Sequence, residues 1–386
     1  MTHSADAFTT PKPDNVPIIG AGPAGLSCAI VLARSGVNVT VYDRRPRVGA
    51  RFHNDFQGLE NWTHSANILV EMGNAGIEAT FDHIPVTSGI AFDAWNKRYT
   101  VSSEEPLYYL VRRGDGAGTL DQGLLEQARS LGVDVRFNEN VKEAPENAVL
   151  SIGPRTADVI AVGYVFDTDM ADGNWVCFNN GLAPHGYAYL LVANGRGTVA
   201  TCLFSGFKNQ NVHLERTVKF FETHAALTMK NPKPFGGYGN IRLPRSAIQG
   251  NKPVIGEHAG FQDSLAGFGM SYAIRSGIMA AHGILGISDY HESWRRELLP
   301  LLKTSIANRF LFNIVGERGR RMALARISGD DSRSTLQNLY NPWWMSKLVL
   351  PFALRFFKAP LKDKSCDHVG CSCVWCEHGI SQAEKE

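Results

Sequence analysis

The chain has 386 residues, of which 44% are hydrophobic and 20% are charged. This composition is typical of a folded globular protein and excludes disorder along the whole chain. The length suits two interleaved domains with an appendage. The net charge of +2 gives no general electrostatic reason to expect a nucleic-acid partner. No apolar run reaches the roughly 20 residues that a membrane-spanning helix needs.

The ends of the chain differ from its middle. Residues 1–15 are polar, contain several prolines and lack the apolar core of a secretory signal, so we expect a disordered lead. Cys28, Cys177 and Cys202 are isolated, and the other four cysteines crowd between 366 and 376. That spacing is unlike a secreted disulfide framework and favours a cytoplasmic protein.

The first elements form a β–α–β unit. The apolar run 16–20 predicts a strand, residues 25–35 have the apolar spacing of a helix, and 37–42 predict a second strand. Such a unit opens doubly wound folds. The elements expected next are a helix at 64–76, strands within 85–112, a helix at 119–131 and a strand at 133–137.

The second half of the chain changes character twice. Residues 147–206 alternate apolar residues with Gly, Asp and Asn turns, which predicts an antiparallel sheet. A helix is expected at 214–229. After residue 252 a strand, a glycine-rich loop and a helix at about 269–285 are expected, and residues 290–360 are expected to be largely helical.

A G-x-G-x-x-G run joins the first strand to the first helix, formed by Gly20, Ala21, Gly22, Pro23, Ala24 and Gly25. In this motif the first glycine permits a tight turn, the second lets the backbone approach a pyrophosphate, and the third allows close helix–strand packing. The helix then presents free amides and the positive end of its dipole to the phosphates. Because strand, helix and second strand follow in order, the run predicts a dinucleotide site.

An acidic residue ends the second strand. Asp43 lies 18 residues beyond Gly25, where a carboxylate accepts hydrogen bonds from a ribose hydroxyl and disfavours a 2′-phosphate. Arg44, Arg45 and Arg47 follow it and are either surface charges or phosphate ligands. We include Arg44 among the expected cofactor-binding residues.

A second glycine loop occurs late in the chain, where residues 254–270 read VIGEHAGFQDSLAGFGM. This loop resembles the G-D-A-A-G-x-x-x-P-x-x-G-x-G-I segment of the geranylgeranyl reductase-like flavoproteins, a branch of the para-hydroxybenzoate hydroxylase-type FAD fold. The resemblance implies bound FAD, with the ribityl chain at Glu257. It also implies a helix aimed at the flavin ring that starts near Gly267, Gly269 and Met270.

Two further segments carry this resemblance. Residues 184–201 are similar to the family's P-x-x-Y-x-W-x-F-P element, which lines the substrate cavity, through Pro184, Tyr187 and Tyr189. Tyr187 and Tyr189 are therefore expected at the reacting substrate. Arg113, which precedes T-L-D-x-G-L-L, resembles an arginine that approaches FAD.

The chain also departs from the family pattern. Glu257 replaces the usual Asp, and residues 49–56 lack the cysteine that members often carry near the flavin. In that segment Arg51 could neutralise a phosphate, and His53 could donate a proton or simply belong to a polar loop. Asp263, in the second glycine loop, is a further candidate of the same kind.

The C-terminal tail holds four cysteines and two histidines within 13 residues. Cys373 and Cys376 have the C-x-x-C chelate spacing, and Cys366, Cys371 or a histidine could complete a tetrahedral zinc site. The alternatives are an iron–sulfur cluster, a redox dithiol serving the flavin, or a tail with free thiols.

Residues 341–358 combine two tryptophans and apolar residues with flanking basic residues. This pattern indicates either a helix packed on the domain below or contact with a membrane surface.

The resemblance implies a reductase of C=C bonds in an apolar, prenyl or lipid-like substrate, with NAD(P)H or a reduced electron-transfer partner as donor. A monooxygenase on the same fold, or a non-catalytic flavin-binding sensor or scaffold, is the alternative. We expect an α/β fold in which a Rossmann-type FAD-binding domain carries an inserted antiparallel-sheet substrate domain and a helical C-terminal region. The expected boundaries are 16–84, 107–160 and 240–290 for the FAD domain, 85–106 and 161–239 for the substrate domain, 291–360 for the helical region and 361–386 for the tail.

Overall fold

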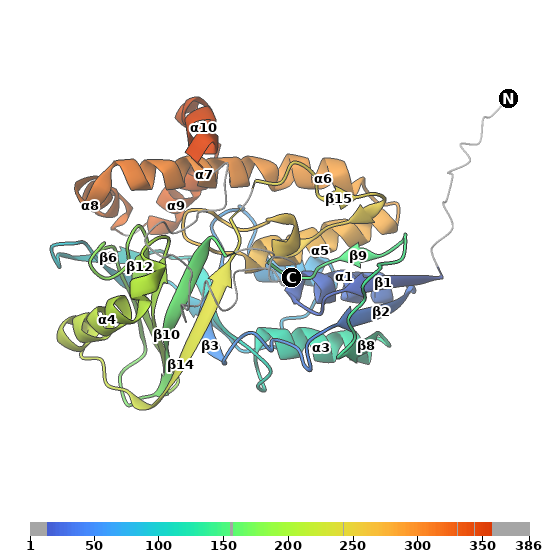
Figure 1. Ribbon diagram of the computed structural model, residues 1–386, viewed down its shortest axis with the longest axis horizontal. Helices are drawn as coiled ribbons and strands as arrows, with labels where there is room; N and C mark the ends of the chain where they lie inside the picture. The colour runs from blue at the N-terminus through green and yellow to red at the C-terminus, as the bar shows by residue number, and fades with distance from the viewer. Residues whose placement is uncertain (1–13, 155–156, 242, 330, 343, 357–386) are drawn as a thin grey trace.

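The computed structural model describes residues 14–154, 157–241, 243–329, 331–342 and 344–356. Figure 1 shows a parallel sheet at one end of the molecule, a large sheet at the other, and a layer of helices along one edge. The predicted α/β fold with an antiparallel sheet and a helical C-terminal region is therefore confirmed.

The parallel sheet has the strand order β8-β2-β1-β9. Its strands are β1 (Asn15–Ile19), β2 (Asn38–Asp43), β8 (Asp134–Phe137) and β9 (Val149–Leu150). Helices α1 (Pro23–Arg34), α3 (Leu120–Ser130) and α5 (Met270–Ile284) share with this sheet one large apolar core.

Helix α5 approaches α1 very closely. A Cβ atom added at Gly277 would collide with the carbonyl oxygen of Ala24, so the two helix backbones are in direct contact there. Gly22 is the N-cap of α1 and Gly269 is the N-cap of α5. The packing at Gly277 therefore fixes the position of one helix start relative to the other.

The large sheet has the strand order β14-β10-β13-β12-β11-β5-β6, and all its neighbours pair antiparallel except β5 and β11. The strands are β5 (Ser88–Phe92), β6 (Arg98–Ser102), β10 (Val159–Asp167), β11 (Gly173–Cys177), β12 (Tyr187–Ala193), β13 (Arg196–Leu203) and β14 (Lys230–Gly239). Helix α4 (Gln210–Ala225) packs Phe220 and Phe221 against it.

Smaller elements join these two parts. A three-stranded sheet has the order β3-β7-β4. The connecting elements are β3 (Asp55–Glu60), α2 (Ile68–Asn74), β4 (His83–Val86), β7 (Tyr108–Arg113), β15 (Ile248–Gln249), β16 (Lys252–Pro253) and the 3-10 helices Phe207–Asn209 and Gly256–Ala259. The helical region comprises α6 (Tyr290–Glu297), α7 (Leu299–Ile314), α8 (Gly316–Ile327), α9 (Ser332–Tyr340) and α10 (Trp344–Phe356).

Two helices differ from the sequence-based boundaries. The helix expected at 64–76 begins only at Ile68, because the Asn67 side chain accepts a hydrogen bond from the Leu69 amide and caps it. The helix expected at 214–229 starts earlier and ends at Ala225, because Ala226 adopts a left-handed φ of +51°.

Candidate functional site

The first glycine loop has the geometry that a phosphate group requires. Gly20 has a φ of +115°, and a Cβ there would collide with the Ser151 carbonyl oxygen. A Cβ at Gly25 would collide with the Gly20 carbonyl oxygen, so the helix packs directly on the strand end. By contrast, a Cβ at Gly22 would meet nothing within 4 Å. Gly22 thus leaves open space at the start of α1, where the amides are free.

Asp43 organises the same loop. Its half-buried carboxylate accepts a hydrogen bond from the Ala21 amide at 2.8 Å and another from the Arg45 amide at 2.8 Å. The acid therefore holds the glycine loop as well as facing the site. Arg44 is exposed at the rim, and Arg47 pairs with Asp115 at 2.6 Å.

The second glycine loop is shaped by a buried carboxylate. Asp263 accepts hydrogen bonds from the Leu265 amide at 3.1 Å, the Ala266 amide at 2.6 Å and the Tyr340 hydroxyl at 3.1 Å. Burial raises the pKa of Asp263 to about 6, although these hydrogen bonds oppose the shift. Asp263 therefore holds the loop that leads through Gly267 into α5.

Two arginines point toward the site from the connecting strands and loops. Arg51 donates to Glu257 at 3.2 Å and to the Tyr238 carbonyl at 2.8 Å. Glu257 also accepts from the Asn240 amide at 3.0 Å. These contacts place Arg51 and Glu257 side by side, although they are 206 residues apart in the sequence.

Arg113 is held by a different acid. It makes two hydrogen bonds of 2.8 Å to the Asp121 carboxylate, and its guanidinium lies 4.0 Å from the centre of the Phe52 ring. Burial alone would lower the pKa of Arg113, but Asp121 outweighs it and raises the pKa. Arg113 therefore stays charged, and two of its guanidinium nitrogens already donate hydrogen bonds to Asp121.

Both glycine loops open into one cavity of about 1470 Å³. This volume exceeds the roughly 300–1,000 Å³ of a pocket for one small ligand, so it has room for a dinucleotide and a substrate. The expected residues that line it are Gly20, Gly22, Pro23, Ala24, Asp43, Arg44, Arg51, Arg113, Tyr187, Tyr189, Glu257, Gly267, Gly269 and Met270. Gly25 is not among the lining residues, in keeping with its packing position.

The far part of the cavity is largely apolar. The large sheet with its adjoining loops, the segment after β3 and the C-terminal helices supply it, with side chains that include Trp62, Trp175, Phe178, Phe204, Leu311 and Phe312. Such a wall suits an apolar ligand, because it offers burial from water and few polar partners.

Tyr187 and Tyr189 lie where the polar and apolar parts of the wall meet. Both come from β12, and their rings are 6.2 Å apart. The Tyr187 hydroxyl donates to the carbonyl of Ala266, in the second glycine loop, at 2.5 Å. Burial raises the pKa of both hydroxyls well above 10, so both keep their protons at neutral pH.

Three expected residues have no place in this wall. His53 is exposed and is not among the residues that line the cavity, because Asn54 turns the chain with a φ of +62° and Asp55 accepts the His53 amide. Asp263 is buried behind the loop and is not a lining residue either. Pro184 also lies outside the lining set.

The expected metal ligands Cys366, Cys371, Cys373 and Cys376 lie outside the described residues. Zinc therefore stays a prediction from the sequence. Among the described residues, no group of three or more candidate ligands gathers as a metal would require.

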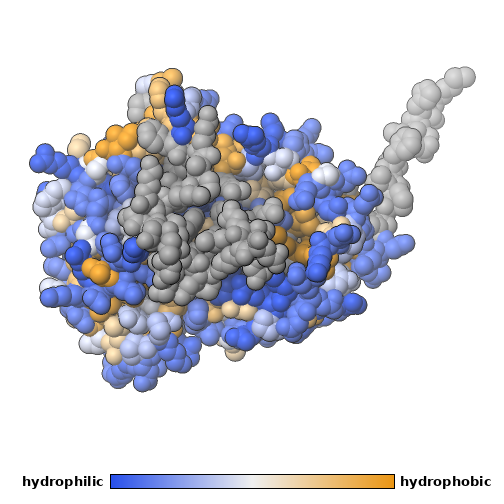
Figure 2. All heavy atoms as spheres, viewed as in Figure 1, coloured by the Kyte–Doolittle hydropathy of each residue, from blue (hydrophilic) through white to orange (hydrophobic). Residues whose placement is uncertain are grey.

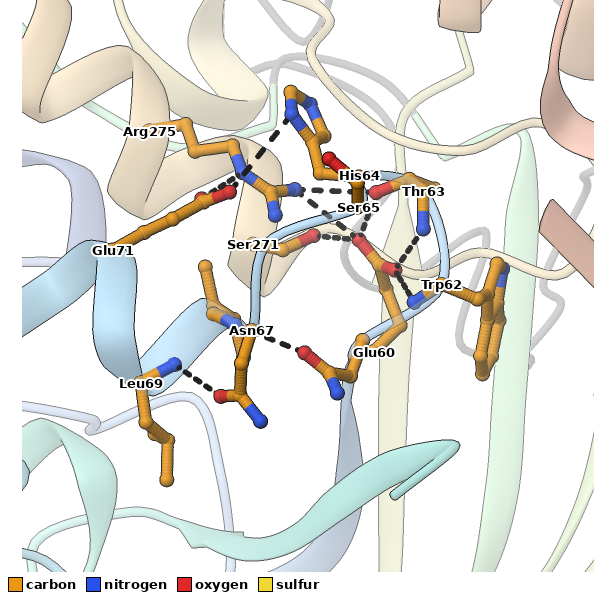
Figure 3. A network of polar contacts seen from close by, with 12 residues as sticks. Glu60, Trp62, Thr63, His64, Ser65, Asn67, Leu69, Glu71, Ser271 and Arg275 are labelled. Carbon is orange, nitrogen blue, oxygen red and sulfur yellow. Dashed lines mark hydrogen bonds and ion pairs between the residues drawn. The ribbon is translucent and has the colours of Figure 1, made fainter. Parts of the chain in front are cut away.

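A buried polar network anchors α5 from behind, and sequence reasoning missed it (Figure 3). Glu60 accepts hydrogen bonds from the Thr63 hydroxyl at 2.7 Å and from the Ser271 hydroxyl. Arg275 lies 3.6 Å from Glu60 and donates to Glu71 at 2.7 Å. Because Ser271 is in the first turn of α5, this network fixes the helix start that faces the cavity. Ser271 is 211 residues from Glu60, so no local pattern announces the contact.

A buried arginine on α7 holds the second glycine loop from the other side. Arg309 donates to the Leu265 carbonyl at 3.1 Å and to the His185 carbonyl, and its guanidinium stacks 3.4 Å above the Phe204 ring. Burial, with Arg320 nearby, lowers the pKa of Arg309 to about 9. Sequence reasoning missed this residue too, because one arginine within a helix carries no distinguishing pattern.

Known proteins share this architecture. Residues 18–84 match the family described as NAD(P)-binding Rossmann-like domain. A geranylgeranyl bacteriochlorophyll reductase-like protein of Thermoplasma acidophilum superposes with a TM-score of 0.66 at 15% identity, over 89% of this chain and 98% of that one. The chain has the fold of the geranylgeranyl reductase-like flavoproteins. The p-nitrophenol 4-monooxygenase PnpA of Pseudomonas putida shares this reductase-like fold with a TM-score of 0.57 at 13% identity, over 91% of this chain and 100% of PnpA.

Sequence relatives give the same picture at lower coverage. The digeranylgeranylglycerophospholipid reductase 1 of Methanothermobacter thermautotrophicus is 23% identical, over 69% of this chain and 75% of its own length. Other curated relatives, two putative oxidoreductases and a glutamate synthase small chain of Escherichia coli, match only 34 to 39 residues. This chain spans 5 to 7% of their length. These relatives and neighbours are named as reductases, monooxygenases or other oxidoreductases. They support an FAD-dependent enzyme.

Proposed function

We propose that the protein is an FAD-dependent oxidoreductase that reduces C=C bonds of an apolar, prenyl or lipid-like substrate. The observation that carries the proposal is the single cavity, whose polar part is made by two glycine loops and two helix starts and whose other part is apolar. One ligand with phosphates and one apolar ligand would meet there.

The residues fit FAD. The pyrophosphate would lie at the open space above Gly22, and the ribose near Asp43 would find a carboxylate that already holds the loop. Arg51 and Glu257 would face the middle of the cofactor, and the start of α5 at Gly269 would face the ring. When bound, FAD supplies the hydride chemistry that no side chain offers.

The chain's own residues would orient the substrate and control protons. The aromatic and aliphatic wall excludes water from the reacting alkene. Tyr187 and Tyr189 hold their hydroxyl protons at the boundary of the apolar part, where a proton for the second alkene carbon is needed. We assign neither Asp263 nor His53 this role, because neither lines the cavity.

The substrate class rests on the apolar wall and on the geranylgeranyl compounds after which the similar reductases are named. The donor would be NAD(P)H binding transiently or a reduced electron carrier, since the first glycine loop is taken by FAD in this proposal.

The visible spectrum of the purified protein, followed by identification of the cofactor released on denaturation, is the first test. We expect FAD in about equal amount to protein. The flavoprotein would then be reduced without oxygen and mixed with prenyl alkenes such as geranylgeraniol. Reoxidation of the flavin with loss of a double bond supports the reductase. Substrate-dependent oxygen consumption with product hydroxylation would instead make the protein a monooxygenase, and a protein that cannot bind FAD would overturn the whole proposal.

A further inference from the structure

Helix α10 carries an apolar stripe on its outer face. Trp344, Leu348 and Phe352 are four residues apart and are 68%, 62% and 65% exposed. With about 100° of rotation per residue, these positions share one side of the helix. Ser346 and Ala353 are buried and fall on the opposite side, against α7.

Helices α7 and α8 also carry exposed apolar residues. At the junction of α7 and α8, Ile314 and Val315 are 63% and 45% exposed, and Met322 on α8 is 75% exposed. Figure 1 shows α10 projecting beyond α7 at the edge of the molecule, with α8 at the end of α7. Figure 2 shows hydrophobic residues at this edge. Exposed apolar residues gathered in this way mark an interaction surface.

The C-terminal helices carry more positive charge than the chain as a whole. Residues 299–356 contain nine Lys and Arg against three Asp and Glu, whereas the whole chain has 39 against 37. Six of these basic side chains are exposed: Lys303, Arg318, Arg321, Arg326, Lys347 and Arg355. Arg321 pairs with Asp93 at 3.3 Å, so it is not counted among the cations that would face headgroups. Basic side chains around an exposed apolar stripe complement an anionic lipid surface.

The substrate cavity reaches the same region. Val315 and Ala323 both line the cavity and are exposed, so the cavity wall meets the molecular surface beside Ile314 and Met322. A lipid that left a bilayer at this surface would enter the apolar part of the cavity directly.

We propose that the docking surface formed by Trp344, Leu348, Phe352, Ile314 and Met322 binds the protein to anionic membranes, with the cavity mouth at α7–α8 facing the lipid. The proposal deepens the proposed function by naming the source of the substrate. Among the described residues, no helix is long and apolar enough to cross a membrane. The helices would therefore lie in the interface, with the stripe inserted and the basic side chains at the headgroups.

Vesicle co-sedimentation of the full-length protein tests the proposal. We expect binding to vesicles of phosphatidylcholine mixed with phosphatidylglycerol, much weaker binding to phosphatidylcholine alone, and loss of binding at high salt. The double variant Leu348→Ser/Phe352→Ser should lower the partition coefficient at least about tenfold, because two exposed apolar side chains are removed. The charge variant Lys347→Glu/Arg355→Glu should remove the preference for anionic vesicles.

The matched control is Val70→Ser/Val212→Ser, which removes two exposed apolar side chains on α2 and α4. It should bind vesicles like the wild type. Equal binding by the Leu348→Ser/Phe352→Ser variant and the wild type, or no binding by the wild type, would overturn the proposal. A concentration-dependent dimer that this variant lacks would identify the surface as a contact between two copies and also overturn it. The assay needs no turnover, so a protein that binds vesicles but cannot be loaded with FAD would refute the proposed function alone.

Discussion

Substitutions at two glycines of the first loop, Gly22 and Gly25, should affect cofactor binding and folding separately. Ala at Gly22 meets no protein atom, and its φ of −79° suits any residue. We therefore expect Gly22→Ala to cost less than about 1 kcal/mol of folding free energy, mainly through the poorer N-cap. Its methyl group would occupy the space above the free amides. Losing one charge-assisted hydrogen bond of about 1.5–3 kcal/mol weakens FAD binding by about 10- to 100-fold.

Gly25→Ala should do the reverse. Its Cβ would collide with the backbone carbonyl of Gly20, which cannot rotate away. Overpacking costs about 1–3 kcal/mol, and the better helix propensity of Ala returns about 1 kcal/mol. Because the clash is with a backbone atom, we expect the upper end of this cost and a net loss of about 2 kcal/mol in the free energy of unfolding.

Urea denaturation of the apoprotein measures the folding effect, and quenching of FAD fluorescence measures affinity. Gly73→Ala on α2 is the matched control, because its Cβ would also meet nothing and it lies away from the cavity. Wild-type FAD affinity in Gly22→Ala would show that the phosphates do not lie at the start of α1. Unchanged stability in Gly25→Ala would refute the packing argument.

Three further changes test the acids. Asp43→Ala removes the acceptor of the Ala21 amide, and FAD titration should show affinity about tenfold weaker, with Asn restoring part of it. Glu60→Ala leaves the buried Thr63 and Ser271 hydroxyls without their acceptor, while Arg275 keeps Glu71, so urea unfolding should show a loss of about 1–3 kcal/mol. The raised pKa of Asp263 means that the fold favours its protonated form. Its contribution is therefore fully present below pH 3.8 and falls as pH rises to about 6, by up to about 3 kcal/mol. The pH dependence of unfolding should lose this component in Asp263→Asn, and an unchanged profile would contradict the assignment.

Features that are set by residues close together in the chain could be predicted from the sequence. The loop at Gly20–Gly25 and the acid Asp43 are set by a strand, a turn and a helix within 30 residues, and their geometry follows from local sterics. The second loop was found only through its resemblance to a family. His53 shows the limit of chain proximity, because a single turn at Asn54 takes it away from the cavity while Arg51 faces inward.

The missed contacts all join distant segments. Glu60 and Ser271 are a strand end and a helix start 211 residues apart, and each is unremarkable in its own segment. Arg309 on helix α7 reaches the Leu265 carbonyl in the loop before α5. Such pairs arise from tertiary packing, which local propensity and spacing do not encode.

These long-range contacts also connect the second glycine loop to the apolar wall of the cavity. Helix α7 holds the second glycine loop through Arg309, and the same helix supplies Leu311 and Phe312 to the apolar wall. The loop in turn accepts the Tyr187 hydroxyl at its Ala266 carbonyl. Arg309 on α7 and Tyr187 on the large sheet therefore bind adjacent backbone carbonyls of the same loop. A shift of α7 would therefore move the apolar wall and the second glycine loop together.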